Sequence, residues 1–432
     1  MSPVPENTAS LNTAPVILPG ALLGFLGGGQ LGRMTAMAAR TMGYRVRVMD
    51  PELACPASFV ADETIVGRWD DVDAARRLAT GVDVVTLEIE QIGADALSAV
   101  AQIVPLRPSV EPIRIIQDKT LQKTWLAENG FPVGPFRVVR NEADLREAVP
   151  ALGGNVFLKV GRGGYDGRGQ ARITPGATTD LGQVWQELGA TSAVAEQALE
   201  LECEISVMAA RNPAGEVRSF PAARNHHENQ ILAWSVLPAG VPQEIESRAE
   251  ALAAEIIAKI GVEGLLCVEF FVTRSGELLV NELAPRTHNS YHQSERGCAT
   301  SQFEQMVRAM CNLPLGDTSI NTPCAIANLL GEVWLDAVNG SPNFAAALAV
   351  PGVRLHLYEK HTPRRGRKMG HLSSVGATAE EALERVLEAK RRLDPIYAAV
   401  LAGEQSGVAE GDVFGEIRSR VRQRPVKAKP RR

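Results

Sequence analysis

Short apolar runs alternate with helical stretches between residues 22 and 106, and this alternation constrains the fold more than any other feature of the chain. Leu22–Leu26 is predicted to be a buried strand. The helical stretch Gln30–Met42 follows it and stops at Gly43, a residue type common just after a helix. Further strands are predicted at Tyr44–Met49, Val82–Glu90 and Ile103–Leu106. Strands that alternate with helices form βαβ units, so this region is predicted to be a small doubly wound domain with a parallel sheet.

The rest of the chain is predicted to add two domains. A long amphipathic helix, Glu111–Asn129, leads into a segment with strands at Asn155–Val160 and Ala193–Ala198. A helix at Gln243–Ile260 and a hairpin at Leu265–Leu283 follow. The expected fold class is therefore α/β (α+β). The expected parts are a disordered extension at 1–20, a Rossmann-like domain at 21–115, a nucleotide-binding region at 116–320 with a lid subdomain at 131–200, a small C-terminal domain at 321–402 and a basic tail at 403–432.

Composition excludes several classes of function. The chain has 432 residues, enough for two or three domains, and its 45% hydrophobic and 22% charged residues are ordinary for a globular protein. The net charge of -5 gives no indication of nucleic-acid or membrane binding, and no apolar run is long enough to span a bilayer. The six cysteines are scattered without a C-x-x-C pair, which favours reduced thiols in the cytoplasm.

The first glycine-rich turn permits two interpretations. Residues 27–32 read G-G-G-Q-L-G and match G-x-G-x-x-G between a predicted strand and a predicted helix. Such a turn can hold a phosphate on the helix N-terminus, and Asp50 lies near the distance expected for a ribose-binding acid. A tight turn that only needs small residues is at least as good an explanation. A dinucleotide site is disfavoured because nothing else in the chain resembles a hydride-transfer site.

A second glycine-rich loop is more informative. Lys159 stands on an apolar strand, where an ammonium group needs an anionic partner. The loop at 161–169 has five glycines in nine residues, so its backbone N–H groups can approach phosphate oxygens and it can close over a ligand. It is not a P-loop, because G-x-x-x-x-G-K-[ST] is absent. The alternative is a flexible surface loop beside a solvated lysine.

The predicted hairpin brings two carboxylates together. A two-residue turn at Ser275-Gly276 places Glu269 directly opposite Glu282. Like charges that face each other destabilise a hairpin unless a cation or a shared proton resolves the repulsion. Asn281 adds a neutral oxygen donor, and oxygen ligands together with a triphosphate are typical of Mg²⁺. The alternative is one exposed glutamate and one at a strand end.

Together these residues resemble the ATP-grasp superfamily. The resemblance rests on Lys159 with residues 163–170, then Glu269, then the N-E-L-A-P-R block at 281–286. Within the superfamily, three blocks resemble the N5-carboxyaminoimidazole ribonucleotide synthetases: G-G-Q-L-G-R-M at 28–34, G-G-Y-D-G-R-G-Q at 163–170 and G-R-K-M-G-H at 366–371. The T-L-E-I-E block at 86–90 also fits the T-x-E-x-E pattern of that family. The likeness extends from about residue 22 to 402, and the middle block is the most specific.

The resemblance implies the fold, the reaction and the partners. It implies a three-lobed ATP-grasp fold that clamps Mg²⁺-ATP between two lobes, and a homodimer. The implied reaction is the carboxylation of 5-aminoimidazole ribonucleotide by bicarbonate at the expense of ATP, in purine biosynthesis. The implied partners are these small molecules, with no nucleic acid and no membrane.

The resemblance also implies the site residues. Those expected to bind ATP are Lys119, Lys159, Gly164, Tyr165, Asp166, Gly167, Arg168, Gly169, Gln170, Glu196, Gln197, Ala198, Leu199, Glu204, His227, Asn281 and Glu282. Those expected to bind bicarbonate and the ribonucleotide are Gln30, Leu31, Tyr165, Asp166, Arg168, His288, Asn289, Lys360, Arg367 and Lys368. Mg²⁺ is expected on Glu269, Glu282 and Asn281.

The implied chemistry fits these residue types. Phosphorylation of bicarbonate by ATP gives carboxyphosphate, so the protein mainly positions its substrates and neutralises charge. Lys159 is expected on the phosphates and Arg286 on bicarbonate or carboxyphosphate, and Asp166 is the candidate acceptor of the amine proton. A basic cluster fits the 5′-phosphate, or else forms an exposed basic loop: Lys360, Arg364, Arg365, Arg367 and Lys368.

The chain departs from the family at one position. Tyr291 stands in H-N-S-Y-H where the family has glycine, so the local turn or the pocket wall is expected to differ. Two activities of the same fold are alternatives, a formate-dependent glycinamide ribonucleotide transformylase and a biotin carboxylase. A nucleotide-binding regulatory protein is a third, but it need not retain both Glu269 and Glu282.

Overall fold

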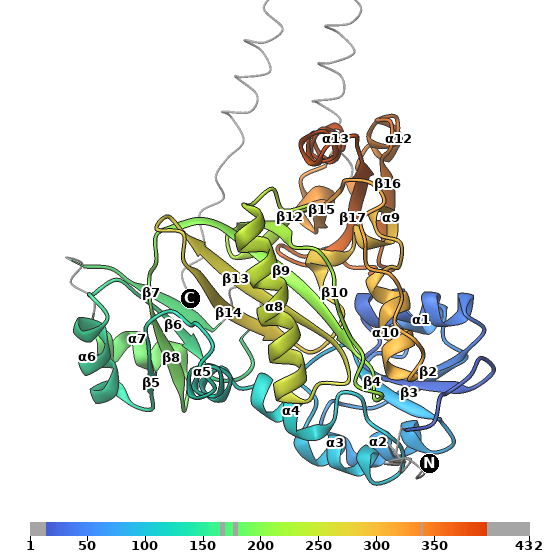
Figure 1. Cartoon of the computed structure of the whole chain (residues 1–432), viewed down its shortest axis with the longest axis horizontal. Helices are drawn as coiled ribbons and strands as arrows, with labels where there is room; N and C mark the ends of the chain where they lie inside the picture. Colours follow the sequence, from blue (N-terminus) through green and yellow to red (C-terminus); the bar gives the residue numbers. More distant parts are fainter. Residues whose placement is uncertain (1–13, 165–168, 176–179, 338–339, 395–432) are drawn as a thin grey trace, which may run out of the picture.

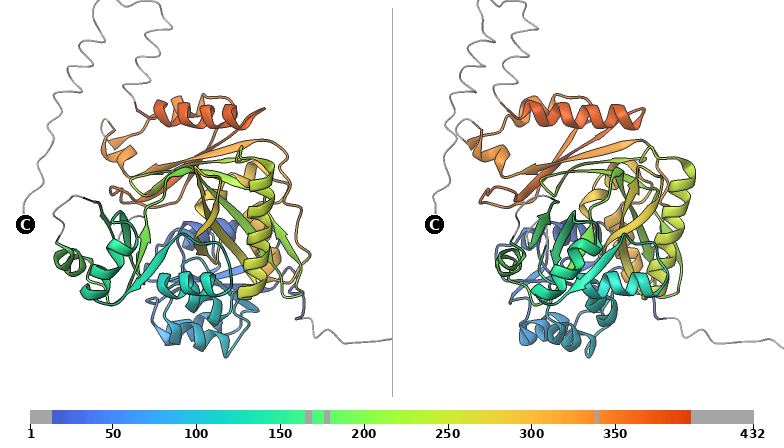
Figure 2. Two further views of the ribbon diagram at one scale, coloured as in Figure 1. Left: turned by 60° about the vertical axis from the view of Figure 1, so that its left-hand side comes forward. Right: turned by 90° about the vertical axis from the view of Figure 1, so that its left-hand side faces the viewer.

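The computed structural model describes residues 14–164, 169–175, 180–337 and 340–394, and the strands of these residues form three sheets (Figure 1). The N-terminal lobe has a four-stranded parallel sheet, a small lobe has a four-stranded antiparallel sheet, and a nine-stranded sheet joins the centre to the C-terminal lobe. The left view of Figure 2 shows the small lobe to one side of the central sheet, and in the right view this lobe faces the viewer. Within the described residues, no helix is long and apolar enough to cross a membrane.

The N-terminal lobe is the doubly wound domain predicted from the sequence. Its parallel strands run in the order β3-β2-β1-β4, with α1 against one face and α2 and α3 against the other. The central strand β1 is buried along its whole length, as expected where helices cover both faces of a sheet. The elements are β1 (Leu22–Leu26), α1 (Gln30–Thr41), β2 (Arg45–Asp50), η1 (Pro56–Phe59), β3 (Glu63–Val66), α2 (Val72–Ala79), β4 (Val84–Leu87), α3 (Ala94–Ala101) and α4 (Val110–Ile116).

The structure corrects three expectations for this lobe. Strand β3 was not predicted, because a four-residue edge strand with exposed ends has no apolar run. Residues 103–106 form no strand, although Leu106 makes an isolated parallel bridge to Val85. Residues 14–20 are not part of a disordered extension: the Ile17 N–H donates to Cys311 O over 2.9 Å, and Ile17 O accepts from the Tyr44 hydroxyl over 2.7 Å. Residues 1–13 lie outside the described residues.

The predicted helix Glu111–Asn129 is two helices, α4 and α5 (Lys119–Glu128). They are separated at Asp118, whose carboxylate accepts from the Thr120 N–H over 3.0 Å and caps α5. The Lys119 N–H donates to Gly161 O over 2.7 Å, so the start of α5 is fixed to the end of strand β6 (Val156–Val160). The break therefore places the backbone of Lys119 beside the start of the glycine-rich loop.

The small lobe carries two of the predicted strands, each with bounds within one residue of the expectation. Its antiparallel sheet has the order β5-β8-β6-β7 and packs on α6 and α7. The elements are β5 (Phe136–Val139), α6 (Glu142–Ala151), β6 (Val156–Val160), β7 (Gln170–Ile173), α7 (Leu181–Leu188) and β8 (Ala193–Gln197).

The central part of the nine-stranded sheet is covered on both faces. Alternate residues of β9 and β13 point to opposite faces, so Val207 and Val268 pack toward α8 while Met208 and Cys267 pack toward α10. Helix α8 crosses one face of these strands in Figure 1. The elements are β9 (Leu201–Arg211), β10 (Val217–Ser219), β11 (Ala223–Glu228), β12 (Ile231–Leu237), α8 (Gln243–Ile260), β13 (Gly264–Thr273), β14 (Leu278–Ala284), η2 (Asn289–Tyr291), α9 (Ser294–Gly297) and α10 (Gln302–Met310).

The C-terminal lobe continues the same sheet. Strand β15 pairs with β12, so the sheet runs without interruption in the order β14-β13-β9-β11-β12-β15-β17-β16. Helix α13 covers β15 and β17 with an apolar face that includes Val386 and Ala389. The elements are β15 (Cys324–Leu330), α11 (Glu332–Leu335), α12 (Phe344–Leu348), β16 (Arg354–Leu357), β17 (Lys368–Val375) and α13 (Ala379–Arg392).

Candidate active site

The hairpin of β13 and β14 places Glu269 directly opposite Glu282, as predicted, but by a different route. The loop is longer than the expected two-residue turn, because the Thr273 N–H donates to Glu277 O. The pairing next to the loop is therefore shifted by one residue. A bulge at Asn281 shifts it back, which restores the predicted partners. A bulge redirects the side chain that it carries, and here that side chain is the neutral oxygen donor of the predicted metal site.

The two carboxylates of the pair have different surroundings. Lys119 forms an ion pair with Glu282, and the Glu269 carboxylate lies 3.5 Å from His288 Nε2 and 3.4 Å from Asn281 Nδ2. Burial raises the pKa of Glu282, but Lys119 and Lys159 outweigh burial and lower it overall. Burial also raises the pKa of Glu269; His227 opposes this and Glu282 adds to it, so that pKa is raised overall. Glu282 is thus the more acidic member of the pair.

Lys159 does not stand alone on its strand. Its Nζ atom lies 2.5 Å from Glu196 Oε2, and Lys123 Nζ lies 2.9 Å from Glu196 Oε1. The carboxylate is thus held between two ammonium groups. Burial alone would raise the pKa of Glu196, but the two lysines outweigh burial and lower this pKa to about 2. Glu196 was expected to bind ATP, and in the structure its carboxylate pairs with Lys159 and Lys123. Lys159 Nζ also lies 3.5 Å from Asn281 Oδ1, which joins this cluster to the carboxylate pair.

The other residues expected around ATP line the junction of the small lobe and the central sheet. Glu204 on β9 forms an ion pair with His227 on β11, with 2.8 Å between Oε2 and Nδ1. Gln197 ends β8, and Ala198 and Leu199 form the connection to β9. Gly164, Gly169 and Gln170 lie at the two ends of the glycine-rich loop. The residues between them, Tyr165, Asp166, Gly167 and Arg168, lie outside the described residues.

The N-terminal glycine turn is filled by protein groups. The Glu88 carboxylate accepts from the Gly29 N–H over 2.7 Å and from the Gly32 N–H over 3.0 Å. Asp50 accepts from the Gly28 N–H over 2.9 Å, so its carboxylate is already bound to the backbone of the turn. A side chain on Gly29 would place its Cβ 2.5 Å from Glu88 Oε1. Glu88 therefore occupies the position that a dinucleotide phosphate would need, which excludes the dinucleotide interpretation.

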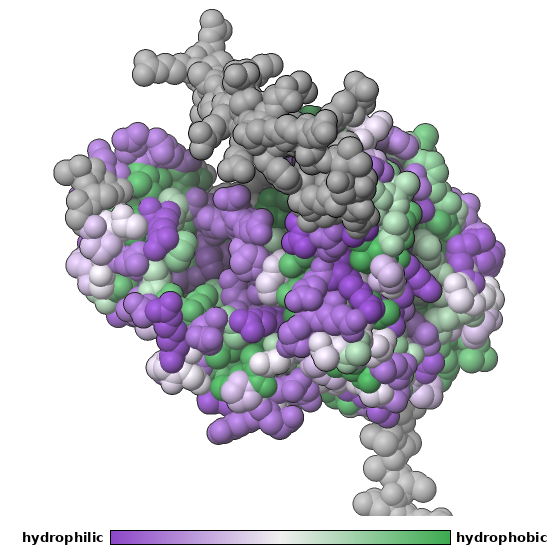
Figure 3. All heavy atoms as spheres, turned by 90° about the horizontal axis from the view of Figure 1, so that it is seen from above, coloured by the Kyte–Doolittle hydropathy of each residue, from purple (hydrophilic) through white to green (hydrophobic). Residues whose placement is uncertain are grey.

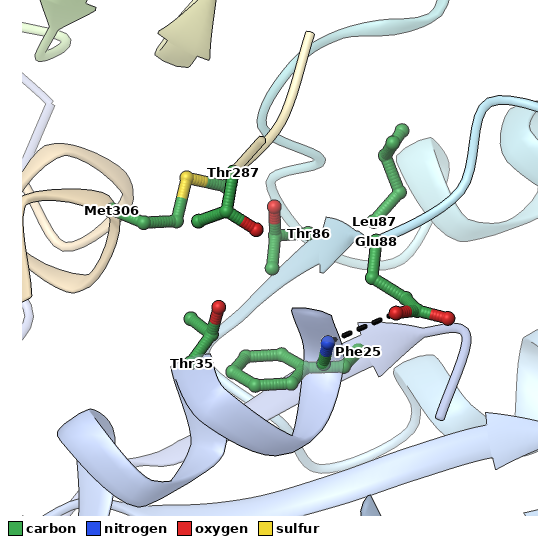
Figure 4. A pocket seen from close by; sticks show the side chains of 8 residues that line it. Phe25, Thr35, Thr86, Leu87, Glu88, Thr287 and Met306 are labelled. Atoms are coloured by element: carbon green, nitrogen blue, oxygen red, sulfur yellow. Dashed lines mark hydrogen bonds between the residues drawn. The ribbon is translucent and has the colours of Figure 1, made fainter. Parts of the chain in front are cut away.

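A small cavity lies beneath this turn (Figure 4). Its volume is about 10 Å³, and Phe25, Thr35, Thr86, Glu88 and Met306 are among the residues around it. A cavity of this size holds about one water molecule. Thr86 Oγ1 is buried there without a hydrogen-bond partner among the described residues. The cavity is far too small for a nucleotide, so it belongs to the packing of the N-terminal lobe.

The first residue of α1 reaches the C-terminal lobe. Lys360 Nζ donates to Gln30 Oε1 over 2.6 Å and to Lys368 O over 2.9 Å. The structure therefore brings together three of the residues expected at the ribonucleotide. The Arg367 guanidinium donates to Thr362 O over 2.8 Å within its own loop. Leu31, which was also expected to bind bicarbonate and the ribonucleotide, is 8% exposed.

The segment after β14 connects the two halves of the site. Arg286 Nη2 lies 2.8 Å from Glu90 Oε1, and its Nε atom is buried without a partner among the described residues. Both polar atoms of the Asn289 side chain are also buried without a described partner. Burial lowers the pKa of His288, and the nearby cations Arg286 and Lys368 lower it further. A neutral imidazole, a guanidinium and an amide therefore line this segment and can bind a small anion.

The surface of the molecule is hollowed beside the small lobe. A view from above shows the hollow between the small lobe and the rest of the molecule, with hydrophilic walls (Figure 3). Lys159 and Glu196 enter the site from the small lobe, Glu269 and Glu282 from the central sheet, and a basic loop from the C-terminal lobe. The arrangement can hold a polyanion between cations while oxygen donors face each other beside it.

Sequence reasoning missed two residues of this region. Lys123 was missed because a lysine on a helix is normally solvated, whereas here it is 6% exposed. Glu88 was noted only as part of a family block, and its hydrogen bonds to the glycine turn were not foreseen. The only sequence indication for Glu88 is its position directly after the buried strand β4, where side chains reach the edge of a parallel sheet.

Models of three protein families match consecutive parts of the chain. A ribonucleotide synthetase preATP-grasp domain matches residues 21–117, an ATP-grasp domain matches 124–303, and a phosphoribosylaminoimidazole carboxylase C-terminal domain matches 324–385. The chain is 40% identical to the N5-carboxyaminoimidazole ribonucleotide synthase of Brucella melitensis, over 83% of this chain and 97% of that protein. It is 38% identical to the Bacillus subtilis enzyme of the same name, over 86% and 96%.

Solved structures agree with these relatives. An ADP complex of an N5-carboxyaminoimidazole ribonucleotide synthetase superposes with a TM-score of 0.81 at 38% identity, covering 87% of this chain and 97% of that one. An Aspergillus clavatus N5-carboxyaminoimidazole synthase, in complex with ADP and 5-aminoimidazole ribonucleotide, superposes with a TM-score of 0.79 at 30% identity, covering 87% and 99%.

Proposed function

The chain belongs to the family of N5-carboxyaminoimidazole ribonucleotide synthases, and on that premise we propose how its own residues carry out the reaction of the family. The reaction is the ATP-dependent carboxylation of 5-aminoimidazole ribonucleotide in purine biosynthesis, and the chain is an ATP-grasp ligase. The formate-dependent and biotin-dependent alternatives are not favoured, since relatives that match nearly their whole length are carboxyaminoimidazole ribonucleotide synthases.

One observation supports the assignment of the residues. The stretch from Asn281 to Asn289 contributes to both halves of the site. Its first part places Asn281 and Glu282 beside Lys159 and Lys119. Its last part carries Arg286, His288 and Asn289 toward the N-terminal lobe, where Arg286 meets Glu90. A phosphoryl donor bound on the first part is therefore adjacent to an acceptor bound on the last part, as direct transfer requires.

The donor set beside the phosphates suits Mg²⁺. Glu269, Glu282 and Asn281 offer only oxygen atoms, the ligands that Mg²⁺ prefers in proteins together with substrate phosphates. Within the described residues, no three His, Cys, Asp or Glu side chains form a complete metal site, so the nucleotide would supply the remaining ligands. Burial and the nearby charge of Glu282 raise the pKa of Glu269, and a bound cation would offset both effects. When bound, Mg²⁺ would neutralise phosphate charge.

Each step of the carboxylation requires particular residues of the chain. A bicarbonate oxygen attacks the γ-phosphorus of ATP, the bond to the β–γ bridging oxygen breaks, and ADP leaves. Lys119 and Lys159 would hold the phosphates, and Arg286 would hold the bicarbonate and the carboxyphosphate that forms. The amine nitrogen of the ribonucleotide then attacks the carboxyl carbon, phosphate leaves, and the nitrogen loses a proton. We assign that proton to Asp166, and the 5′-phosphate to Lys360, Arg367 and Lys368.

The test measures phosphate release at fixed Mg²⁺-ATP while one substrate is replaced at a time. ATP cleavage is expected to be slow with bicarbonate alone and to rise strongly when 5-aminoimidazole ribonucleotide is added, in proportion to carboxylated product. Formate is not expected to replace bicarbonate, because formyl transfer leaves no carboxylate on the product. Full activity with formate and glycinamide ribonucleotide would reassign the chain to the transformylases.

We also propose that the enzyme is a cytoplasmic homodimer. The six cysteines are all free thiols and five of them are buried, which suits a reducing compartment. The dimer rests on the resemblance to the family, and light scattering coupled to size-exclusion chromatography measures it directly. A mass near 46.3 kDa at micromolar concentration would contradict the dimer.

A further inference from the structure

The basic loop of the C-terminal lobe contains a tight turn at Arg364–Arg367. The Arg367 N–H donates to Arg364 O over 2.9 Å, and Gly366, the third residue, has a φ of 73°. This geometry belongs to a type II turn, which favours glycine at its third position. The turn is followed directly by Lys368, whose carbonyl accepts from Lys360. The orientation of the turn therefore decides where the cations of the loop point.

The turn is held by the start of α11. The Gly331 N–H donates to Arg367 O over 2.9 Å, and the Gly366 N–H donates to Glu332 Oε1 over 2.9 Å. Gly331 also lies against the turn itself, because a Cβ atom there would be 2.1 Å from Arg364 O. The backbone of Gly331 and the side chain of Glu332 therefore both hold the turn, and both from the side of α11.

Glu332 differs from the other acids beside the loop. Asp336 bonds the exposed side chain of Arg365 over 3.0 Å, whereas Glu332 bonds the backbone. Glu332 Oε2 is buried and has no hydrogen-bond partner among the described residues. Burial lowers the pKa of Lys390 on α13. The nearby charges of Glu228 and Glu332 oppose this shift but do not outweigh it. A buried carboxylate oxygen without a hydrogen bond is costly, so Glu332 is not explained by stability alone.

We propose that Glu332 is a positioning residue for the ribonucleotide: its carboxylate holds the Arg364–Arg367 turn so that Arg367 and Lys368 meet the 5′-phosphate. Glu332 touches no substrate in this scheme and acts through the Gly366 N–H. The inference rests on the proposed function, because it takes the basic loop as the 5′-phosphate site. It predicts an effect confined to the ribonucleotide, since α11 lies in the C-terminal lobe and the nucleotide cluster lies between the other lobes.

The experiment compares steady-state kinetics of full-length variants in two series: the ribonucleotide is varied at saturating bicarbonate and Mg²⁺-ATP, and Mg²⁺-ATP is varied at saturating bicarbonate and ribonucleotide. Glu332→Ala removes the acceptor and is expected to raise the KM for the ribonucleotide about tenfold, while kcat and the KM for ATP stay within about threefold. Glu332→Gln keeps an oxygen acceptor for the Gly366 N–H and is expected to restore the KM. Asp336→Ala is the matched control, because it removes an acid that bonds only the exposed Arg365 side chain.

Further variants separate the possible failures. Gly331→Ala keeps the Glu332 carboxylate, but its added Cβ atom pushes the Arg364–Arg367 turn away. The KM for the ribonucleotide is therefore expected to rise in this variant too. Gly331→Ala replaces Glu332→Ala in the experiment if Glu332→Ala does not fold. The proposal would be overturned if Glu332→Ala lowered kcat and raised the KM for ATP as much as it raised the KM for the ribonucleotide. It would also be overturned if the KM of Glu332→Gln for the ribonucleotide were as high as that of Glu332→Ala. If Lys368→Ala raises the KM for the ribonucleotide but Glu332→Ala does not, only the positioning role is wrong. If neither variant changes that KM, the assignment of the 5′-phosphate site is wrong as well.

Discussion

Glu269 and Glu282 face each other across β13 and β14, yet their pKa values are shifted in opposite directions. Lys119 and Lys159 stabilise the charge on Glu282, whereas burial and the charge of Glu282 disfavour the charge on Glu269. In the absence of metal the pair therefore holds one firmly ionised carboxylate and one that takes up a proton more readily. A divalent cation would make both charges favourable, which links metal binding to the loss of a proton.

The first prediction concerns Glu282→Gln. This change removes the repulsion with Glu269 and also the attraction to Lys119, so the stability of the metal-free protein is expected to change by no more than about 1 kcal/mol. The Mg²⁺ dependence of turnover is expected to weaken strongly, because one of two carboxylate ligands is lost. Urea unfolding without Mg²⁺ and kinetics across a Mg²⁺ titration measure both effects. Unchanged Mg²⁺ dependence together with a clearly destabilised protein would contradict the facing-pair argument.

The second prediction compares Lys159→Met with Lys123→Met. Both changes remove one cation from Glu196, so each is expected to cost a few kcal/mol of stability, about 3 kcal/mol at most since the other lysine remains. Only Lys159 also reaches toward Asn281 and the predicted phosphate position, while Lys123 donates to Val280 O. Lys159→Met is therefore expected to weaken ATP binding at least about a hundredfold, and Lys123→Met much less. Calorimetric titration with ATP measures this, and equal losses would remove Lys159 from the phosphates.

The third prediction is a pH dependence of stability carried by Glu196. The two lysines lower its pKa in the folded protein to about 2, against an ordinary value of 4.5. Because the folded pKa is lowered, the stabilisation is present above pH 4.5 and is lost as the pH falls toward 2. The shift corresponds to at most about 3 kcal/mol.

Glu196→Gln provides the comparison for this pH dependence. The free energy of unfolding of the wild type minus that of the variant, from urea titrations at pH 7, 5, 4 and 3, is expected to shrink as the pH falls. A difference that stays constant over this range would show that Glu196 is not ionised between the lysines.

The fourth prediction concerns Tyr291. Its buried hydroxyl donates to Ser206 O over 2.7 Å and lies 2.9 Å from Pro221 O, and its ring packs edge-on against Phe220. Its φ is not positive, so the backbone at this position does not require the glycine of the family. Tyr291→Phe is expected to cost about 1–2 kcal/mol of stability, for the hydrogen bond that is lost, and to keep activity within a few-fold. A hundredfold loss of activity at unchanged stability would reveal a catalytic role.

The sequence predicted the elements whose pattern is local. The strands Leu22–Leu26 and β6 and the helix Gln243–Ile260 follow from continuous apolar runs, helical periodicity and flanking glycines, and the structure confirms them. The break of the helix at Asp118 was missed, because an aspartate inside a helical pattern is tolerated unless it caps a new helix, and here the contact of Lys119 with Gly161 fixes the break.

The candidate site was predicted in its residue types but not in its pairings. The facing of Glu269 and Glu282 was predicted correctly although the turn was not, because the bulge at Asn281 compensates for the longer loop. No local sequence pattern predicts such a bulge. The pairing of Glu196 with Lys123 and Lys159 joins two strands of the small lobe to helix α5 and could not be read from spacing. The anchoring of Gln30 by Lys360 joins residues 330 positions apart and could not be read either.

The continuity of the nine-stranded sheet has a mechanical consequence. Its hydrogen bonds join β14, which carries Glu282, to β17, which begins at Lys368, so the carboxylate pair and the basic loop belong to one stiff frame. The small lobe has a sheet of its own, and Lys159 and Glu196 both stand on it. A rotation of the small lobe would carry these two residues together relative to the carboxylate pair and the basic loop. Such a rotation would change the distance between Lys159 and Asn281, while the carboxylate pair and the start of β17 would keep their positions relative to each other.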